Sequence, residues 1–263
     1  MKPQTQIYNP AELAYHEYGK GIPLVLLHGY PLDYTIWEKI VPSLEKRARV
    51  ILPDLRGHGA SPEMADRVSI REMAEDVYAL YEKLQSGRMI LGGHSMGGYI
   101  TLAYAHAYPQ HLTGLALIAT QSEADTPERR QGRLITAREV RRRGVGYLAK
   151  GMPSKLTDNL DIQHQIQGII EKTRQNTLIQ SQKAMADRPD ASPWLANITV
   201  PTLVIAGTQD HLIPVEQSAA MVQLLNKGWL VELSSAGHLP MMEDPDGVVE
   251  ALEQLICAAA GCE

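Results

Sequence analysis

Six short runs of apolar residues recur along the chain. They span residues 22–29, 49–54, 88–95, 112–120, 201–210 and 228–238. The apolar core of each run is nearly continuous, which is typical of a strand buried on both faces of a parallel sheet. Residues 13–19 instead alternate between apolar and polar side chains, so we predict an antiparallel strand there, at the edge of the sheet.

Between these runs, apolar side chains recur with the spacing of amphipathic helices. Residues 69–84 predict a helix with one apolar stripe, formed by Ile70, Met73, Val77, Leu80, Tyr81 and Leu84. Ser69 and Glu72 stand at the spacing of a capping box at its start. Residues 96–108 and 215–225 also predict helices. Because strands and helices alternate, we predict an α/β fold with a mostly parallel central sheet flanked by helices.

One region interrupts this alternation. From about Gln121 to Ala191 the sequence contains no buried strand and has polar segments of helical character instead. These segments span residues 127–150, 158–172 and 173–187. The pattern predicts a sheet-containing core formed by residues 1–120 and 192–263, with residues 121–191 inserted as a helical cap.

Composition narrows the class of protein. The formal net charge of −5 argues against a nucleic-acid partner, which usually requires a basic surface. No apolar run is long enough to span a membrane, and the first residues lack the apolar core of a signal peptide. Cys257 and Cys262 do not form a readable disulfide framework. We therefore expect a cytoplasmic protein. Since no residues have metal-ligand spacing, we expect no metal, and no cofactor is expected either.

The stretch from Gly92 to Gly98 joins a predicted strand to a predicted helix. Gly93, Ser95 and Gly97 within it match the G-x-S-x-G pattern of a nucleophile elbow. In such a turn the strand and helix backbones approach closely, so positions 93 and 97 require small residues and the serine adopts a strained conformation. The start of the following helix directs N–H groups to the same place, which suits a developing oxyanion.

A serine nucleophile needs a base and an orienting acid, which in this type of fold follow in the order Ser, Asp or Glu, then His. Asp210 and His238 each come after a predicted strand. Both therefore fall where ligands bind in open α/β sheets, beyond the carboxyl ends of strands. We predict the catalytic triad Ser95, Asp210 and His238, and we interpret the adjoining His94 and His211 as non-catalytic.

Five motifs give the chain a resemblance to the α/β-hydrolase superfamily. They are His28 to Pro31, Asp54 to Ser61, Gly93 to Gly98, Gly207 to Asp210, and Gly237 with His238. The resemblance implies an α/β-hydrolase fold in which the backbone N–H groups of Tyr30 and Met96 form the oxyanion hole. It also implies that His28 braces its loop rather than reacting.

Within the superfamily, the stretch around Ser95 and the start of the cap resemble the 3-oxoadipate enol-lactonase-like and small carboxylesterase-like branch. This resemblance implies a serine hydrolase that cleaves small carboxylic esters through an acyl-enzyme. A lactonase, a cofactor-free perhydrolase-like enzyme and a slow-turnover ligand receptor are the alternatives. The expected partner is a small-molecule ester or lactone, and both a monomer and a homodimer stay open. Dehalogenases and related epoxide hydrolases use aspartate as the nucleophile, so the serine argues against those chemistries.

Two further groups of residues are candidates for substrate contact. The expected pocket lining consists of Tyr34, Trp37, Trp194, Leu212, Leu239 and Met241. The predicted cap also contains an arginine-rich segment with Arg129, Arg130, Arg133, Arg138, Arg141, Arg142 and Arg143. We interpret this segment as a solvated helix face, with guidance of anionic substrates as the alternative.

Overall fold

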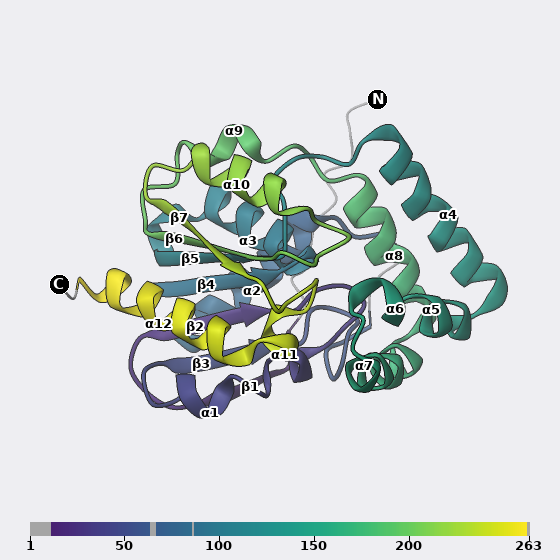
Figure 1. The fold of residues 1–263 in the computed structure, drawn as a ribbon, viewed down its shortest axis with the longest axis horizontal. Coiled ribbons are helices and arrows are strands. Elements are labelled where there is room, and N and C mark those ends of the chain that lie inside the picture. The colour runs from purple at the N-terminus through teal and green to yellow at the C-terminus, as the bar shows by residue number, and fades with distance from the viewer. Residues whose placement is uncertain (1–11, 64–66, 86, 262–263) are drawn as a thin grey trace.

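The computed structural model of the chain describes residues 12–63, 67–85 and 87–261. The strands are β1 (Tyr15–Tyr18), β2 (Pro23–Leu27), β3 (Arg49–Pro53), β4 (Met89–His94), β5 (Leu112–Ile118), β6 (Thr202–Gly207) and β7 (Gly228–Leu233). They form one sheet in the order β1-β3-β2-β4-β5-β6-β7 (Figure 1). β1 is antiparallel to β3, and all other neighbouring pairs are parallel. The six parallel strands therefore present their carboxyl ends at one edge of the sheet.

Helices cover both faces of the sheet. On one face α1 (Val41–Leu44) packs against α12 (Pro245–Ala260), which also contacts β5 and β6. On the opposite face α2 (Ile70–Leu84) packs against α3 (Met96–Ala107), which contacts β2, β4 and β5 (Figure 1). α10 (Val215–Gln223) packs against β6 and β7. The short elements are η1 (Tyr34–Trp37), η2 (Pro109–His111), α9 (Ser192–Leu195) and α11 (Pro240–Glu243).

The sequence pattern agrees with this architecture. Every residue of β2, β4 and β6 is buried, as their continuous apolar runs predict for strands covered on both faces. β1, with its alternating pattern, lies at the edge of the sheet. At the start of α2, the Ser69 side chain accepts from the Glu72 N–H and the Glu72 side chain accepts from the Ser69 N–H. The predicted α/β fold and this capping box are confirmed.

The chain between β5 and β6, all of which the structure describes, contains helices and no strand. Its main helices are α4 (Pro127–Arg143), α5 (Val145–Gly151), α6 (Pro153–Leu156), α7 (Leu160–Lys172) and α8 (Gln175–Ala186). We call residues 127–186 the helical insertion. It packs against loops that follow strands of the sheet: Thr177 Oγ1 donates to the Gly57 carbonyl after β3, and Arg129 donates to the Leu212 carbonyl after β6. The helical insertion therefore lies beside the carboxyl edge of the sheet (Figure 1).

Some expectations concern residues outside the described part of the chain. These are the segment 1–11, where a signal peptide was not expected, and Cys262. Within the described ranges, none of the helices has both the length and the apolar character needed to cross a bilayer. Nor do the described His, Cys, Asp and Glu side chains form a group of three or more that could hold a metal ion.

Candidate active site

Ser95 lies at the turn between β4 and α3. Its backbone angles, φ 51° and ψ −111°, are unusual for a residue other than glycine. Such a conformation costs about 1–3 kcal/mol and persists only where neighbouring structure holds it. The Ser95 N–H donates to the Ile118 carbonyl (2.9 Å), and the Ser95 carbonyl accepts from Thr120 Oγ1 (2.8 Å). The end of β5 and the residues after it therefore hold the strained turn.

The glycines on either side of Ser95 are required by close packing. A Cβ atom at Gly93 would lie 2.2 Å from the Gly97 carbonyl oxygen. A Cβ atom at Gly97 would lie 2.5 Å from the Leu27 carbonyl oxygen, at the end of β2. Both distances are far below van der Waals contact and involve backbone atoms. Helix α3 therefore starts directly against two strands, which gives the physical reason for glycine at these positions.

His238 and Asp210 reach Ser95 from the loops that follow β7 and β6. His238 Nε2 lies 3.1 Å from Ser95 Oγ, and His238 Nδ1 lies 2.7 Å from Asp210 Oδ2. Both side chains are almost completely buried. With the proton on Nδ1, the imidazole donates to the carboxylate and presents Nε2 as acceptor to the serine hydroxyl, which is the tautomer that a general base requires.

The Asp210 carboxylate is saturated with hydrogen bonds. Its Oδ1 accepts from the backbone N–H groups of Leu212 (2.7 Å) and Ile213 (3.0 Å), which leaves Oδ2 for His238. Burial raises the pKa of Asp210, but the charge of His238 and these hydrogen bonds outweigh it, so the pKa lies below its ordinary value. The carboxylate is therefore ionised at neutral pH and can stabilise an imidazolium.

The loop after β2 passes directly beside the elbow. A Cβ atom at Gly29 would lie only 3.1 Å from Ser95 Cβ. Neither the Tyr30 N–H nor the Met96 N–H donates a hydrogen bond to another described residue. Both groups are thus unused by the protein at the position where an oxyanion hole is predicted, and their role stays a prediction.

His28 holds this loop in place. Its Nε2 accepts from the Leu55 N–H (2.9 Å), and its Nδ1 lies 2.9 Å from the Gly29 carbonyl oxygen, to which it donates. The side chain is fully buried, and burial lowers the pKa of His28 below its ordinary value. The imidazole is therefore neutral and connects the loop after β2 to the loop after β3.

Two residues that sequence reasoning missed or left without a role hold the backbone of His238. Glu243 Oε2 accepts from the N–H groups of Gly237 (2.8 Å) and Leu239 (3.0 Å), the residues on either side of His238. His94 Nε2 donates to the His238 carbonyl (2.7 Å), and burial lowers the pKa of His94 to about 3, so that this imidazole is neutral. The backbone around the candidate base His238 is therefore anchored from α11 and from the elbow itself.

Glu243 also links the loop of His238 to the helical insertion. Its second oxygen, Oε1, accepts from Thr157 Oγ1 at 2.5 Å, and Thr157 is the C-cap residue directly after α6. The only signal in the sequence is an acidic residue five positions after His238, in a turn whose geometry the sequence does not specify. The contact with Thr157, 86 residues away, has no sequence signal.

The structure distributes the six predicted pocket residues over different environments. Three have no exposed surface and lie in the hydrophobic core: Trp37, Leu239 and Met241. Tyr34 stacks on His16 of β1, with 3.8 Å between ring centroids. Leu212 lies next to the candidate triad, since its N–H binds Asp210. Substrate contact by these residues stays a prediction, and Leu212 is the one that a triad residue contacts directly.

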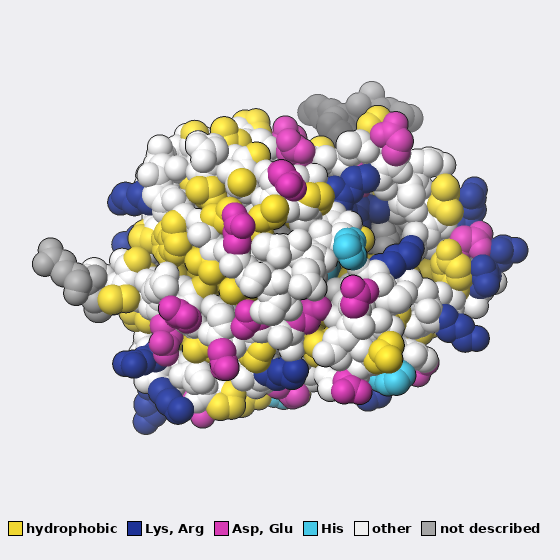
Figure 2. Space-filling model, in the orientation of Figure 1, with side chains coloured by type: hydrophobic (Ala, Val, Ile, Leu, Met, Phe, Trp, Pro, Cys, Tyr) yellow, Lys and Arg dark blue, Asp and Glu magenta, His cyan; other side chains and the backbone are white. Residues whose placement is uncertain are grey.

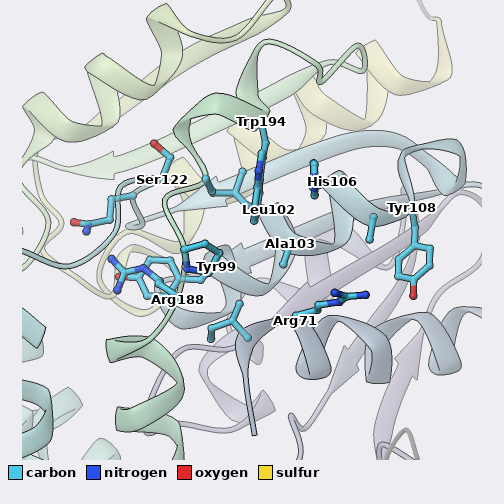
Figure 3. Close-up of a pocket in the computed structure, with 14 residues that line it drawn as sticks. Arg71, Tyr99, Leu102, Ala103, His106, Tyr108, Ser122, Arg188 and Trp194 are labelled. Atoms are coloured by element: carbon cyan, nitrogen blue, oxygen red, sulfur yellow. The ribbon is translucent and has the colours of Figure 1, made fainter. Parts of the chain in front are cut away.

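Trp194, the sixth, lines a separate cavity of about 620 Å³ (Figure 3). There its ring stacks on His106 of α3, with 4.3 Å between centroids. Tyr99, Leu102 and Arg188 also line this cavity, whereas Ser95 and His238 do not. The cavity therefore lies along α3 rather than over Ser95.

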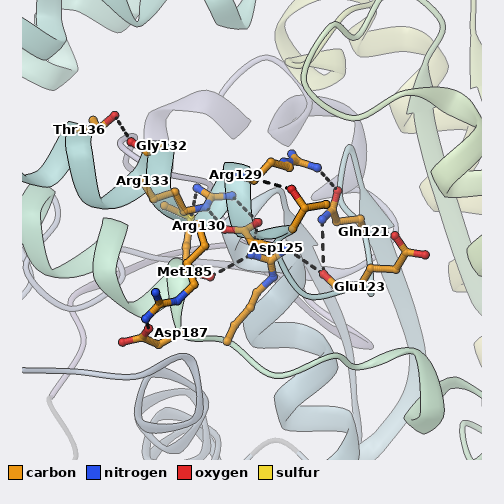
Figure 4. Close-up of polar contacts among 12 residues, drawn as sticks. Gln121, Glu123, Asp125, Arg129, Arg130, Gly132, Arg133, Thr136, Met185 and Asp187 are labelled. Atoms are coloured by element: carbon orange, nitrogen blue, oxygen red, sulfur yellow. Dashed lines mark hydrogen bonds and ion pairs between the residues drawn. The ribbon is translucent and has the colours of Figure 1, made fainter.

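The arginine-rich segment divides into two groups. Five side chains are exposed: Arg130, Arg138, Arg141, Arg142 and Arg143. Figure 2 shows Lys and Arg side chains on the outer surface of the helical insertion and along its junction with the rest of the molecule. Arg129 and Arg133 are partly buried and bind polar groups of the segment after β5: Arg129 Nη1 donates to Gln121 (2.8 Å), and Arg133 Nε donates to Asp125 (2.5 Å) (Figure 4).

A hydroxyl, an imidazole and a buried carboxylate in this order can carry out acyl transfer. The imidazole removes the serine proton as the oxygen attacks, and the carboxylate stabilises the imidazolium that forms. The neighbouring unused N–H groups and the start of α3 lie where negative charge would develop on an attacked carbonyl.

Comparisons with known proteins agree with this fold. A family model described as alpha/beta hydrolase fold matches residues 22–142 and 170–245. The structure of a thermophilic esterase from Thermogutta terrifontis, with malate bound, is 35% identical with a TM-score of 0.90, covering 95% of this chain and 94% of that chain. The enol-lactonase from Burkholderia xenovorans is 26% identical with a TM-score of 0.86, covering 94% of this chain and 96% of that chain.

A curated relative is longer than this chain. The dihydrolipoyllysine-residue acetyltransferase component of the acetoin cleaving system of Pseudomonas putida is 32% identical over 237 residues, which are 87% of this chain and 61% of that protein. The chain thus spans less than two thirds of that relative's length. The chain belongs to the α/β hydrolase fold family, and the resemblance predicted from its motifs is confirmed.

Proposed function

We propose that this protein is a serine hydrolase that cleaves small carboxylic esters through an acyl-enzyme intermediate. The observation that carries the proposal is the hydrogen-bonded chain from Ser95 Oγ to His238 Nε2 (3.1 Å) and from His238 Nδ1 to Asp210 Oδ2 (2.7 Å). The likeness to an esterase at 35% identity over nearly the whole chain supports esters as the substrate class.

In the proposed reaction, His238 accepts the Ser95 proton while Ser95 Oγ bonds to the ester carbonyl carbon. The tetrahedral oxyanion receives hydrogen bonds from the N–H groups of Tyr30 and Met96, each donor contributing about 3–4 kcal/mol in comparable sites. The intermediate collapses as His238 protonates the departing alkoxide. Water then attacks the acyl-enzyme, with His238 again as base, and releases the acid and the free serine.

We further propose that residues 121–191 form a cap over the site and that residues 1–120 and 192–263 form the core. The contact between Thr157 and Glu243 supports this division, because it joins the helical insertion to the loop of the proposed base. A cap in this position would restrict substrate size and exclude water from the reacting groups.

Lactone hydrolysis is the second candidate. It uses the same nucleophile and base on an internal ester, and the likeness to an enol-lactonase at 26% identity favours it. Esters of malate and of similar acids also belong in a substrate panel, since the structure of the similar Thermogutta esterase was solved with malate bound.

The direct test is multiple-turnover cleavage of p-nitrophenyl acetate and butyrate by the purified protein, followed by a panel of alkyl esters and lactones. A serine-directed phosphonate should label Ser95 and abolish the activity, and Ser95→Ala should be inactive and unlabelled. Labelling at another residue, or full activity of Ser95→Ala, would refute the assignment of the nucleophile.

A further inference from the structure

Asp125 is buried between two arginines. Its Oδ2 accepts from Arg133 Nε (2.5 Å), and its Oδ1 accepts from Arg188 Nη1 (2.7 Å). The side chains of Asp125, Arg133 and Arg188 are 0%, 18% and 3% exposed. The neighbouring carboxylates along the chain belong to exposed residues: Glu123, Glu128, Asp187 and Asp190. Two guanidinium charges therefore share one buried carboxylate, which leaves one positive charge in excess.

Of the two arginines, Arg133 is the one whose guanidinium can donate further hydrogen bonds to a ligand. Burial lowers the pKa of Arg133, but the charge interactions and hydrogen bonds with Tyr99 and Asp125 raise it above its ordinary value, so the guanidinium stays charged. Its Nη1 contacts Met185 Sδ (3.2 Å), and a thioether is a weak acceptor. A buried charge of this kind is costly unless an opposite charge pairs with it. Arg133 is also the more exposed of the two arginines, and hence the one that a ligand can reach.

This excess charge lies close to the nucleophile. Tyr99 follows Ser95 by one helical turn on α3, and the Arg188 guanidinium lies over the Tyr99 ring at 4.0 Å from its centroid (Figure 3). Arg133 Nη1 contacts Met185 Sδ on α8, and Gln182, the neighbour of the Tyr30 phenol, lies one turn earlier on the same helix. The positive charge is therefore within electrostatic reach of both sides of the elbow.

Two buried polar atoms face each other without forming a hydrogen bond of normal geometry, and no other described residue satisfies them. They are Tyr30 Oη and Gln182 Oε1, which come from the loop after β2 and from α8. Burial raises the pKa of Tyr30, so its phenol stays protonated and can donate. Buried polar groups are nearly always satisfied by protein, water or ligand. A phenol whose contact with Gln182 falls short of a normal hydrogen bond can donate instead to an anionic oxygen bound at the Arg133 guanidinium.

We propose that Arg133 and Tyr30 form a subsite for a carboxylate at the far end of the acyl group, so that the preferred substrates are monoesters of short dicarboxylic acids. The inference rests on the proposed esterase function and adds the substrate class. A guanidinium binds a carboxylate through two parallel N–H···O bonds, which a neutral acyl chain of the same length cannot replace.

The kinetic test compares monoethyl succinate and monoethyl glutarate with ethyl butyrate and ethyl valerate, which lack the second carboxylate. For wild-type protein, kcat/KM should be at least about tenfold higher for one of the monoesters than for the neutral esters. Arg133→Met should remove this preference by raising KM for the monoesters. Its kcat/KM for the neutral esters should stay within about twofold of wild type. The variant keeps a balanced Asp125–Arg188 pair, so it should fold.

Arg130→Met is the matched control, because Arg130 lies on the same helix in an exposed ion pair with Asp187. This variant should leave kcat/KM unchanged for the monoesters and for the neutral esters. Equal kcat/KM values for charged and neutral esters in wild type, or a loss of both in Arg133→Met with intact folding, would overturn the subsite while leaving the esterase function in place.

Binding is measured without turnover by thermal unfolding. Glutarate or succinate should raise the Tm of wild-type protein and of Arg130→Met, whereas Arg133→Met should not respond, and butyrate should have no effect on any of them. A Tm response that depends on Arg133 in a protein that cleaves no ester would support the subsite and refute the proposed esterase function. If neither glutarate nor succinate raises the Tm of wild-type protein at any concentration that does not itself denature it, the subsite is overturned.

Discussion

The carboxyl edge of the sheet and the helical insertion use polar residues in opposite ways. At the sheet edge every polar group of the candidate triad has a partner: Asp210 uses both oxygens, and His238 uses both ring nitrogens. At the base of the insertion, Asp125 in the loop after β5 is shared by Arg133 of α4 and by Arg188, which follows α8, and the charges do not balance. A saturated network holds reacting atoms in one geometry, whereas an unbalanced one retains capacity to bind a ligand.

The backbone elements that support these two regions also differ. Ser95, Asp210 and His238 follow strands β4, β6 and β7, whose relative positions the hydrogen bonds of the sheet determine. The arginine cluster combines α4 with the loop after β5 and the segment after α8. We therefore expect substitutions at the sheet edge to change the catalytic rate for all substrates, and substitutions in the arginine cluster to change only the preference among substrates.

The largest effect is expected at the base. His238→Ala should reduce kcat by at least about a thousandfold for neutral and carboxylate-bearing esters alike, because residual catalysis comes only from the oxyanion hole and binding. Steady-state kinetics on both substrates measure this. His211→Ala is the control and should retain activity. If His211→Ala is the inactive variant instead, the base has been assigned wrongly.

A substitution in the elbow should affect folding rather than substrate choice. Gly97→Ala places a Cβ atom 2.5 Å from the Leu27 carbonyl oxygen, so we expect a loss of more than about 2 kcal/mol in the free energy of unfolding, measured by denaturant titration. Gly132→Ala in α4 is the opposite case, since no atom lies within 4 Å of its added Cβ. Because alanine favours a helix over glycine, that variant should gain about 0.5–1 kcal/mol. Equal stability of the two variants would contradict the packing argument.

Glu243 contacts both the loop of His238 and Thr157 of the helical insertion, so its removal should affect catalysis from the side of the insertion. Glu243→Ala releases the N–H groups on both sides of His238, and we expect kcat to fall by about tenfold, with KM changed less. Glu243→Gln should recover most of the activity, because one amide oxygen can still accept from both N–H groups. Thr157→Val, which removes only the link to the insertion, should have a smaller effect than Glu243→Ala. A similar loss in the alanine and glutamine variants would show that the carboxylate charge matters, not the two N–H contacts.

The smallest effect is expected at the exposed end of α4. Arg141, Arg142 and Arg143 are exposed, and Arg142 and Arg143 pair with Glu139 at the surface. Exchange of all three for Gln should leave kcat/KM for charged and neutral esters within about twofold, because surface ion pairs contribute little and salt screens their field. A selective loss for the charged ester at low salt would instead show that these residues guide anionic substrates.

Much of the fold and of the candidate triad could be predicted from local patterns. Continuous apolar runs predict buried parallel strands, because both faces of such a sheet are covered. The carboxyl ends of these strands meet at one edge, so Ser95, Asp210 and His238 could be grouped without knowledge of any contact between them. Gly93 and Gly97 could be interpreted from the elbow motif, although only the clash at Gly93 is local to the turn, whereas a Cβ atom at Gly97 would meet Leu27 of β2.

Side-chain direction beyond those strand ends could not be predicted. Trp37, Leu239 and Met241 are close in sequence to site residues, yet their side chains are fully buried in the core. Proximity along the chain does not say which side of a turn a side chain occupies. The rotation of short helices such as η1 and α11 decides that, and it follows from packing against the rest of the core.

The sequence by itself determined the order of strands and helices, the elbow and the spacing of the candidate triad, because each depends on residues that are neighbours in the chain or on the regular geometry of a parallel sheet. Tertiary structure alone decided the partners of Asp125 and Glu243. Asp125 meets Arg188 across 63 residues, and Glu243 meets Thr157 across 86. Such contacts depend on how the helical insertion docks on the sheet, and docking is set by the summed packing of many side chains, none of which carries a local signal of its partner.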